Sequence, residues 1–160
     1  MSPAEISLAR RRDAPRLAAM SRRLVEAGLE PSWTAERIER HVAHDDSVAI
    51  VAKLRGETVG FAIMQFGDTT AHLNLLAVEP RVRRAGVGRA LVAWLEESAR
   101  VAGTFTVDLE LRAHNAVAER FYRALGYRET GRIRGYYQGA EDAIRMRREL
   151  AVALPTLPAG

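Results

Sequence analysis

The feature that most constrains the fold is a glycine-containing loop between an expected strand and an expected helix. The strand covers residues 71–78, the loop contains Gly86 and Gly88, and the helix runs from Gly88 to about Ala102. The first turn of a helix has unsatisfied N–H groups and the positive end of the helix dipole, which favour an anion. Glycines let the backbone approach a phosphate closely and adopt positive φ. The segment therefore predicts an anion-binding turn in a fold that alternates strands and helices.

The charge of this loop supports a phosphate ligand, but two common nucleotide motifs do not fit it. A Walker A loop needs Lys and then Ser or Thr after its last glycine, whereas Gly88 is followed by Arg89 and Ala90. A dinucleotide fingerprint needs a third glycine where Leu91 stands. On charge alone, a plain surface loop with two turn glycines remains an alternative. The arginines that can pair with phosphate oxygens are Arg81, Arg83, Arg84 and Arg89.

Hydrophobic periodicity predicts a single domain over residues 1–150, followed by a flexible, uncharged tail at residues 151–160. A first helix is expected after an N-cap at Asp13 and should end at Gly28. Gly60 is expected to mark a β-bulge. Early meandering strands and late crossover helices indicate an α/β (α+β) fold with a mixed sheet and helices on both faces. Further strands are expected at residues 6–9, 47–54, 58–66, 106–111, 127–137 and 143–150, and helices at 34–44 and 115–125.

Composition narrows the class of protein. The chain has no cysteine and no run of about 18 apolar residues that could cross a membrane, and its N-terminus lacks the apolar core of a secretion signal. These features predict a cytoplasmic protein without membrane contact. The net charge of +4, with 23 arginines and one lysine, is compatible with a polyanionic partner. Aromatic residues are few and no nucleic-acid-binding motif is present, so a basic nucleic-acid-binding domain is the more remote alternative. No metal is assigned, because no ligand spacing links carboxylates with His41, His44, His72 or His114.

The glycine loop is similar to a known family motif. Val78-x-Pro80 followed by Arg83-x-x-Gly86-x-Gly88 resembles the pyrophosphate-binding motif of the GNAT acetyltransferases. The resemblance implies acetyl-CoA as cosubstrate and a twisted, mostly antiparallel mixed sheet of six to seven strands with about four helices on both faces. It also implies that the backbone of Leu76, Ala77 and Val78 contacts pantetheine and the thioester. The pyrophosphate would be held by Arg83, Arg84, Ala85, Gly86, Val87, Gly88 and Arg89.

A second motif resembles one branch of that family. The segment from Leu109 to Asn115, the segment 118–127 and the closing residues 134–146 are similar to the RimI-type N-terminal acetyltransferases, which modify a ribosomal protein. The resemblance covers residues 75–147 well and the first 70 loosely. It implies that the acceptor is a primary amine, specifically the α-amine of a protein N-terminus. The branch usually has Phe-Pro-Trp where this chain has Pro31-Ser32-Trp33, next to the acceptor site. Trp33, Tyr136 and Tyr137 are accordingly expected to contact the acceptor, although packing within the strand is the alternative role of the two tyrosines.

Acetyl transfer to an amine requires a proton acceptor for the amine and a proton donor for the leaving thiolate. An amine must lose a proton before it attacks a thioester, and the departing thiolate gains from receiving one. Glu110, directly or through water, is the candidate base, although a strand carboxylate commonly pairs with an arginine on the next strand. Tyr122 is the candidate acid, because an apolar stripe of Val117, Phe121 and Leu125 would leave it facing another surface. Asn115 is expected to contact the cofactor, and capping its helix is a sufficient alternative role.

The acceptor is the least constrained part of this interpretation. An α-amine has a pKa of about 8 and a lysine side chain one of about 10.4, so an N-terminus demands less of its base. Within the same family, acetylation of a small-molecule amine or of a lysine side chain is the alternative. The backbone N–H of Val78 is expected to stabilise the oxyanion. A monomer and a homodimer are both compatible with the sequence.

Overall fold

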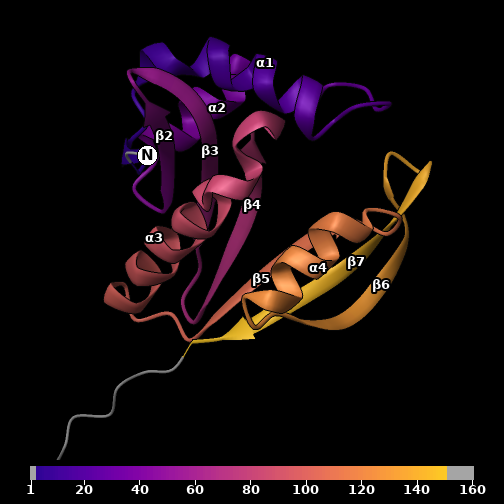
Figure 1. The fold of residues 1–160 in the computed structure, drawn as a ribbon. Coiled ribbons are helices and arrows are strands. Elements are labelled where there is room, and N and C mark those ends of the chain that lie inside the picture. Colours follow the sequence, from indigo (N-terminus) through magenta and orange to yellow (C-terminus); the bar gives the residue numbers. More distant parts are fainter. Residues whose placement is uncertain (1–2, 151–160) are drawn as a thin grey trace, which may run out of the picture.

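The computed structural model describes residues 3–150, so the expected tail at residues 151–160 lies outside the described part. Seven strands and four α-helices follow one another along the chain (Figure 1). The described chain has no helix long and apolar enough to cross a membrane. The strands are β1 (Glu5–Leu8), β2 (Ser47–Leu54), β3 (Glu57–Phe66), β4 (Thr70–Val78), β5 (Thr106–Arg112), β6 (Arg128–Tyr137) and β7 (Glu141–Glu149). The helices are α1 (Ala14–Leu24), α2 (Ala35–Ala43), α3 (Val87–Val101) and α4 (Ala116–Ala124), with short 3-10 helices at Arg11–Asp13 and Pro80–Ala85.

All seven strands belong to one sheet in the order β1-β2-β3-β4-β5-β7-β6. Neighbours are antiparallel except β4 and β5, which run parallel and pair only over Thr70–His72 with Thr106–Asp108. Beyond that short register the two strands diverge, so the sheet is split into two arms that join at one end (Figure 1). The expected fold class, a mixed and mostly antiparallel sheet with helices on both faces, is confirmed.

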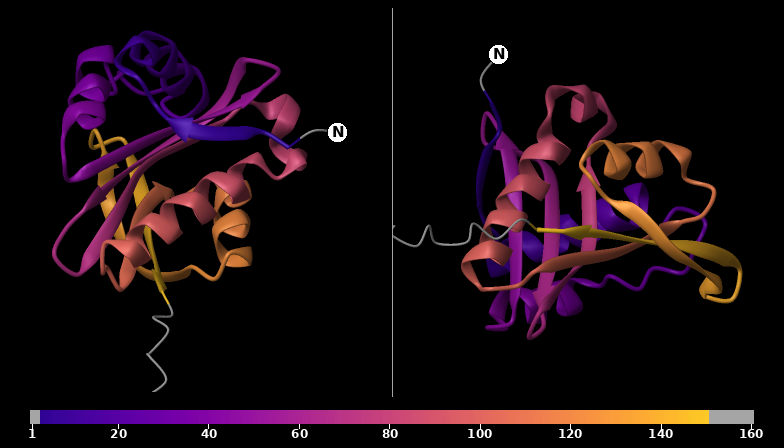
Figure 2. Two further views of the ribbon diagram at one scale, coloured as in Figure 1. Left: turned by 90° about the vertical axis from the view of Figure 1, so that its left-hand side faces the viewer. Right: turned by 90° about the horizontal axis from the view of Figure 1, so that it is seen from below.

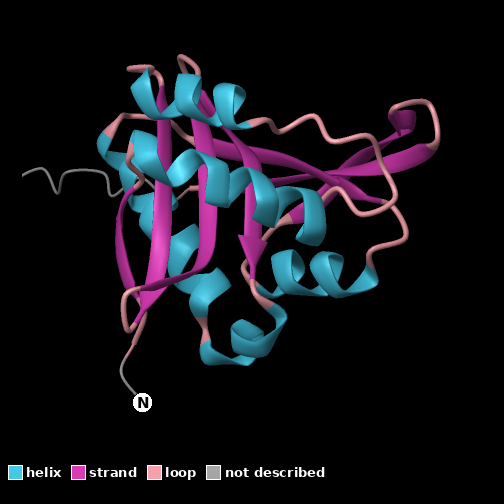
Figure 3. Ribbon diagram, turned by 90° about the horizontal axis from the view of Figure 1, so that it is seen from above, coloured by secondary structure: helices cyan, strands magenta, loops and turns pink. Residues whose placement is uncertain are grey.

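Helices cover both faces of the sheet (Figures 2 and 3). On one face α3 packs on β2, β3 and β4, while Tyr122 of α4 joins the same core with β5 and β7. On the other face α1 and α2 cover β2 and β4 and build a second core around Leu17, Ile38 and Phe61. Successive side chains of β2 point to opposite faces of the sheet, so Ile50 packs in the first core and Val51 in the second.

Two β-bulges shift the pairing of the central strands. The expected bulge at Gly60 is present: the register passes from Ala52–Gly60 to Lys53–Thr58, which leaves one extra residue on β3. A second bulge adds Asn74 to β4, where Ile63 pairs with Leu75 and Met64 with Leu73. Leu73 therefore packs in the core under α3, and Leu75 packs in the core under α1 and α2. The bulge therefore changes which side chains of β4 face each side of the sheet.

Side-chain caps fix the starts of two helices, and the cap at Asn115 was expected. Thr34 Oγ1 and Asn115 Oδ1 each accept a hydrogen bond from the backbone N–H three residues on, at 3.2 and 3.1 Å. Asp13 differs from its expected role, because its carboxylate accepts the backbone N–H of Arg10 at 2.7 Å and caps the preceding 3-10 turn instead of α1. The segment 80–85 was expected as loop and forms a 3-10 helix.

The first helix ends earlier than its sequence predicts. α1 stops at Leu24, and Gly28, the expected end, lies in the following loop with φ +83°. The N–H groups of Val25 and Glu26 both donate to Ser21 O, which closes the helix in a tight turn. Glu26 then turns its side chain inward, where Ser21 Oγ donates to it at 3.0 Å. This inward carboxylate is the physical reason for the early end.

The buried face of α4 also differs from the prediction. Val117 is 61% exposed, whereas Tyr122, expected to face away from the stripe, is 8% exposed and part of the core. Phe121 lies against Gly88 at the start of α3, where a Cβ atom would be 3.2 Å from the ring. This contact turns the helix so that the neighbouring Tyr122 packs inward against Tyr127 at a ring-centroid distance of 5.5 Å.

A buried carboxylate joins α3 to the C-terminal arm. Glu96 is 4% exposed, accepts the Tyr127 hydroxyl at 2.9 Å, and binds Arg148 of β7 at 2.6 Å. Since both carboxylate oxygens have a donor, the group is satisfied inside the core. Removing its charge would leave the Arg148 guanidinium without a counter-ion at the edge of the core.

We expect Glu96→Gln to lower the free energy of unfolding by about 1–3 kcal/mol, because an amide binds a partly buried guanidinium far less well than a carboxylate. Urea denaturation measures the change. Glu97→Gln is the matched control: Glu97 is the exposed neighbour of Glu96 and pairs with Arg100 on the helix surface, so a change within about 0.5 kcal/mol is expected. Equal losses in the two variants would contradict this account of the core.

Candidate active site

A cleft of about 1030 Å³ opens where β4 and β5 diverge. Its walls come from β4, β5, the start of α4, the loop between α1 and α2, and the turn between β6 and β7. Most residues singled out from the sequence lie along it, whereas Arg84, Ala85, Gly86, Val87 and Arg89 do not reach its lining. The predicted site residues that line the cleft are Trp33, Leu76, Ala77, Val78, Arg83, Gly88, Glu110, Asn115, Tyr122, Tyr136 and Tyr137.

The glycine loop lies at one end of this cleft. Gly86 adopts the left-handed region with φ +79° and is the N-cap of α3, which glycine does without strain. The first N–H groups of the helix have no intrahelical partner and form a positive turn. Gly88 is required by the close approach of Phe121 described above. The Arg83 Nε donates to Val78 O at 3.4 Å, so its guanidinium lies next to the last residue of β4.

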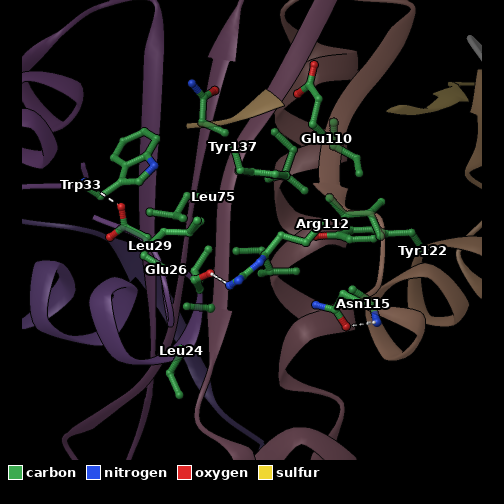
Figure 4. Close-up of a pocket in the computed structure, with 18 of the residues that line it drawn as sticks. Leu24, Glu26, Leu29, Trp33, Leu75, Glu110, Arg112, Asn115, Tyr122 and Tyr137 are labelled. Carbon is green, nitrogen blue, oxygen red and sulfur yellow. Dashed lines mark hydrogen bonds between the residues drawn. The ribbon is translucent and has the colours of Figure 1, made fainter. Parts of the chain in front are cut away.

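Glu110 of β5 is a nearly buried carboxylate that lines the cleft. Its side chain is 9% exposed, and His72 Nε2 donates to its Oε2 at 2.5 Å. Its Oε1 accepts two hydrogen bonds from Arg145 of β7, at 3.2 and 3.3 Å. The structure therefore combines the two roles weighed from the sequence: Glu110 pairs with an arginine across strands and still lines the cleft. Figure 4 shows Glu110, Arg112 and Tyr122 on one side of the pocket, facing Trp33 and Glu26 on the other.

The surroundings shift the protonation of this pair in opposite directions. Burial raises the pKa of the Glu110 carboxyl, but the hydrogen bond and charge of His72 and the charge of Arg145 outweigh it, so the pKa lies below its ordinary value. The hydrogen bond to Glu110 raises the pKa of His72, against the opposing effect of burial. The carboxylate alone is thus a weaker base than an ordinary glutamate, and the imidazole is a stronger base than an ordinary histidine.

Tyr122 reaches the cleft from α4. Burial is the main cause that raises the pKa of its phenol, and nearby Tyr137 adds to it. The hydroxyl consequently keeps its proton at any physiological pH and can only donate it to a stronger base. Phe121 and Tyr127 pack edge-on against its ring on either side. The ring is therefore held in one orientation in the wall of the cleft.

The loop between α1 and α2 forms the opposite wall. Glu26 Oε1 accepts the backbone N–H groups of Ser32 and Trp33 at 2.6 and 3.1 Å, which fixes the loop from inside. Burial raises the pKa of Glu26, and these donors together lower it below its ordinary value. Trp33 is 9% exposed, and the Arg37 guanidinium lies 3.7 Å above its ring. Trp33 is thus chiefly a packing residue whose edge reaches the cleft.

Two side chains of the C-terminal arm hold this loop across the cleft. Arg112 donates to Val25 O at 3.3 Å and Ala27 O at 2.7 Å, and also binds Glu141. Gln138, in the turn after β6, makes two hydrogen bonds with the backbone of Glu30: Nε2 donates to its carbonyl at 2.7 Å and Oε1 accepts its N–H at 3.0 Å. The loop and the turn therefore form a bridge over the open end of the cleft.

Sequence reasoning missed His72, Asn74, Arg112 and Gln138 as residues of the cleft. His72 stands 38 positions before Glu110, and the two meet only because β4 and β5 pair in parallel with His72 opposite Asp108. A predicted parallel pairing of the strand at residues 71–78 with the strand at residues 106–111 is the one sequence inference that could have placed His72 near Glu110. In residues 3–150, no group of three or more His, Asp or Glu side chains could hold a metal ion.

Comparison with known proteins agrees with this geometry. The profile of the acetyltransferase (GNAT) family matches residues 16–127. The [ribosomal protein bS18]-alanine N-acetyltransferase of Escherichia coli K12 is 42% identical over 94 residues, 57% of this chain and 64% of that protein. An uncharacterized N-acetyltransferase of Methanocaldococcus jannaschii is 36% identical over 97 residues, 60% of this chain and 62% of its own length. The chain thus matches somewhat less than two thirds of these curated relatives.

Solved structures extend the likeness over nearly the whole chain. The crystal structure of the ribosomal-protein-S18-alanine N-acetyltransferase from Escherichia coli superposes with a TM-score of 0.81 at 30% identity, covering 96% of this chain and 98% of that one. The seven-stranded sheet split between β4 and β5, the glycine loop before α3 and the matched family profile lead to one assignment. The chain belongs to the GNAT acetyltransferase family.

Proposed function

We propose that this protein transfers an acetyl group from acetyl-CoA to the α-amine of a protein N-terminus, by direct attack in a ternary complex. One observation carries the proposal: His72 and Glu110 are hydrogen-bonded in the same cleft that Tyr122 lines from α4. The cleft thus offers a proton acceptor and a proton donor to one reaction centre. The similarity to enzymes named for acetylating a ribosomal-protein alanine supports the choice of acceptor.

The residues present fit acetyl-CoA. The positive turn at Gly86 and the free N–H groups that begin α3 suit a pyrophosphate, and Arg83 adds a cation beside it. The diverging end of β4, at Leu76, Ala77 and Val78, lines the cleft without β5 as a neighbour and leaves room for an extended pantetheine arm. When bound, the cofactor supplies the activated thioester. Arg84, Ala85, Val87 and Arg89 would act through backbone amides or long-range charge, and Asn115 from the start of α4.

The His72–Glu110 pair is the proposed base. A carboxyl whose pKa is held down by His72 and Arg145 takes a proton poorly from an amine with a pKa of about 8. Neutral His72, whose pKa is raised mainly by its hydrogen bond to Glu110, is better matched to that amine. In this proposal His72 accepts the proton, directly or through water, and Glu110 stabilises the resulting imidazolium. The backbone N–H of Val78 remains the proposed donor to the oxyanion.

Tyr122 is the proposed acid. Its phenol keeps its proton because burial raises its pKa, so it is available when the thiolate leaves. A thiol, with a pKa of about 8.5, is a stronger acid than this phenol, so in this proposal Tyr122 stabilises the departing thiolate by donating a hydrogen bond to the sulfur as the carbon–sulfur bond breaks. The fixed orientation between Phe121 and Tyr127 keeps the hydroxyl directed at the cleft.

In this proposal the enzyme acts in the cytoplasm, where acetyl-CoA and newly made proteins are both present. Its partners would be acetyl-CoA and a protein with a free N-terminus, and the enzyme would act as a monomer or a homodimer. The two hydrogen bonds between Gln138 and the backbone of Glu30 narrow the opening through which the acceptor would enter. A narrow opening suits a single extended peptide end. Tyr136, Tyr137 and Trp33 would contact the first residues of that chain.

We expect acetyl transfer from acetyl-CoA to free N-terminal peptides that begin with Ala, Ser or Met, detected by mass spectrometry. The same peptides with blocked N-termini and a lysine, and polyamines, should remain unmodified. Tyr122→Phe should lower kcat by about 10²–10⁴-fold, the range of general acid–base catalysis. Turnover restricted to lysine or small amines would show that the acceptor is not a protein N-terminus. Absence of acetyl-CoA binding would overturn the whole proposal.

The rate should depend on pH through His72. Because the pKa of His72 is raised, kcat at saturating peptide should fall below a midpoint above the ordinary histidine value of about 6.5. Glu110→Gln removes the partner that raises this pKa, so the midpoint should move to lower pH while the plateau rate falls. The pH dependence of kcat measures both effects. A midpoint that stays in place in Glu110→Gln would exclude His72 as the titrating base.

The hydrogen bonds between Gln138 and the Glu30 backbone should affect binding of the acceptor peptide and not binding of acetyl-CoA. We expect Gln138→Ala to raise KM for the peptide several-fold and to leave KM for acetyl-CoA unchanged, because it frees the loop only at the acceptor end. Glu30→Ala is the matched control, since Glu30 engages Gln138 through its backbone and keeps both bonds. Steady-state kinetics separates the two constants. A parallel rise of both KM values would show that the variant disturbs the whole fold.

A further inference from the structure

Arg37 of α2 is a cation in the cleft wall without a carboxylate partner. Its guanidinium lies 3.7 Å above the Trp33 ring, and its Nη1 donates to Ser32 O at 3.3 Å. Among the described residues it forms no ion pair, and Glu39, the acid two residues further along α2, binds Arg11 instead. A guanidinium has five N–H donors in one plane, so most of those of Arg37 have no acceptor in this part of the chain. The side chain is half-buried and lines the cleft.

The two carboxylates that line the cleft are engaged by donors of the protein itself. Glu110 is held by His72 on one oxygen and by Arg145 on the other. Both oxygens of Glu26 accept hydrogen bonds, from α1 and from the backbone of the following loop, on the inner side of the wall. Neither carboxylate is therefore left to pair with Arg37.

Arg37 is also the arginine of the cleft to which the proposed reaction gives no role. Arg112 is already paired with a carboxylate of β7, and Arg83 lies beside the end of β4, where the pyrophosphate is proposed to bind. Arg37 belongs to the other wall, with Trp33, which Figure 4 shows opposite Glu110. The free cation of the cleft thus lies on the wall that the proposed function assigns to the acceptor, across from the reaction centre.

The charge of Arg37 acts on both sides of the acceptor wall. Burial lowers the pKa of His41, and the charges of Arg37 and of the neighbouring cations lower it further. Across the cleft, burial and the charge of Glu110 raise the pKa of the Tyr136 phenol, and the charges of two arginines, Arg37 among them, oppose that rise. Arg37 and Glu110 therefore lie within electrostatic range of the same tyrosine. An anionic side chain of an acceptor bound beside Tyr136 would enter a region of positive potential.

We propose that Arg37 selects acceptor peptides with an aspartate or a glutamate as second or third residue, by binding that carboxylate through its free N–H groups. This inference rests on the proposed function, because it takes the acceptor to be a peptide N-terminus whose first residue brings the amine to His72 and Glu110. A guanidinium and a carboxylate match in charge and geometry and form two parallel hydrogen bonds. The contact with Trp33 holds the guanidinium in place beforehand, which lowers the entropic cost of the pair. A lysine or arginine at the same peptide position meets a like charge and is disfavoured.

The test compares acetyl transfer to peptides that begin with Ala and differ only in having Asp, Asn or Lys as second residue, and to the same series at the third residue. Asn has the size of Asp without its charge. We expect kcat/KM to be about 5–10-fold higher for Asp than for Asn at one of the two positions, the size of a half-buried, charge-assisted pair, and lowest for Lys. Added salt should reduce this ratio. Equal kcat/KM values for Asp and Asn at both positions would overturn the proposal.

Variants of α2 assign the preference to one side chain. Arg37→Gln should bring the Asp-to-Asn ratio to about one, and Arg37→Glu should make Lys the preferred residue. Arg40→Gln is the matched control, because Arg40 is an exposed arginine of the same helix outside the cleft lining, so its ratio should equal that of the wild type. A purely structural role of Arg37 against Trp33 would slow all peptides by one factor and keep the ratio, which would contradict the proposal. If the Arg37 variants fail to fold, the wild-type ratios and their salt dependence decide.

Calorimetric titration of the same peptides into the protein loaded with CoA needs no turnover and separates this inference from the proposed function. The Asp peptide should bind about 5–10-fold more tightly than the Asn peptide. Such a preference without any acetylation would keep the role of Arg37 and overturn the proposed function. Acetylation of all peptides at equal kcat/KM would keep the proposed function and overturn the role of Arg37. Neither binding nor acetylation of any peptide would overturn both.

Discussion

The site depends on the divergence of β4 and β5. These strands are hydrogen-bonded over only three residue pairs and separate beyond His72, so the sheet has an internal opening with free strand edges. The opening persists because each arm is anchored elsewhere: α3 packs on β2–β4, and Glu96 of α3 binds Arg148 of β7. A continuous sheet would close the cleft, and two independent sheets would not hold its walls in register.

The same divergence explains the electrostatics. His72 lies in the last paired position of β4, and Glu110 follows two residues after its partner Asp108 on β5, where the strands begin to separate. The imidazole and carboxylate therefore meet at the inner end of the opening, close to the core yet open to a ligand. Arg145 and Arg147 on β7 balance the two carboxylates of β5. The outcome is a carboxylate with a lowered pKa beside an imidazole with a raised pKa, a pair that one residue could not provide.

Much of this architecture could be predicted from the sequence, because periodicity and capping are local. The strand bounds of β2, the bulge at Gly60, the caps at Thr34 and Asn115 and the helix after Gly86 all follow from nearby residues. The errors arose where tertiary contacts outside the regular pattern decide, some of them between residues far apart in the chain. α1 ends early because Glu26 turns inward to hold a loop, and Tyr122 is buried because Phe121 needs the space beside Gly88. His72, Arg112 and Gln138 were missed for the same reason: their partners are 38, 85 and 108 residues away.

The central claim is that one cleft brings the amine to His72 and Glu110 and the sulfur to Tyr122. A crystal structure with a bisubstrate conjugate, in which CoA is joined to the α-amine of an Ala-starting peptide, tests it most directly. The account predicts pantetheine between β4 and β5, the conjugated nitrogen within hydrogen-bond reach of His72 or a water held by it, and the sulfur within reach of the Tyr122 hydroxyl. A conjugate bound outside this cleft, or with its sulfur turned away from Tyr122, would contradict it.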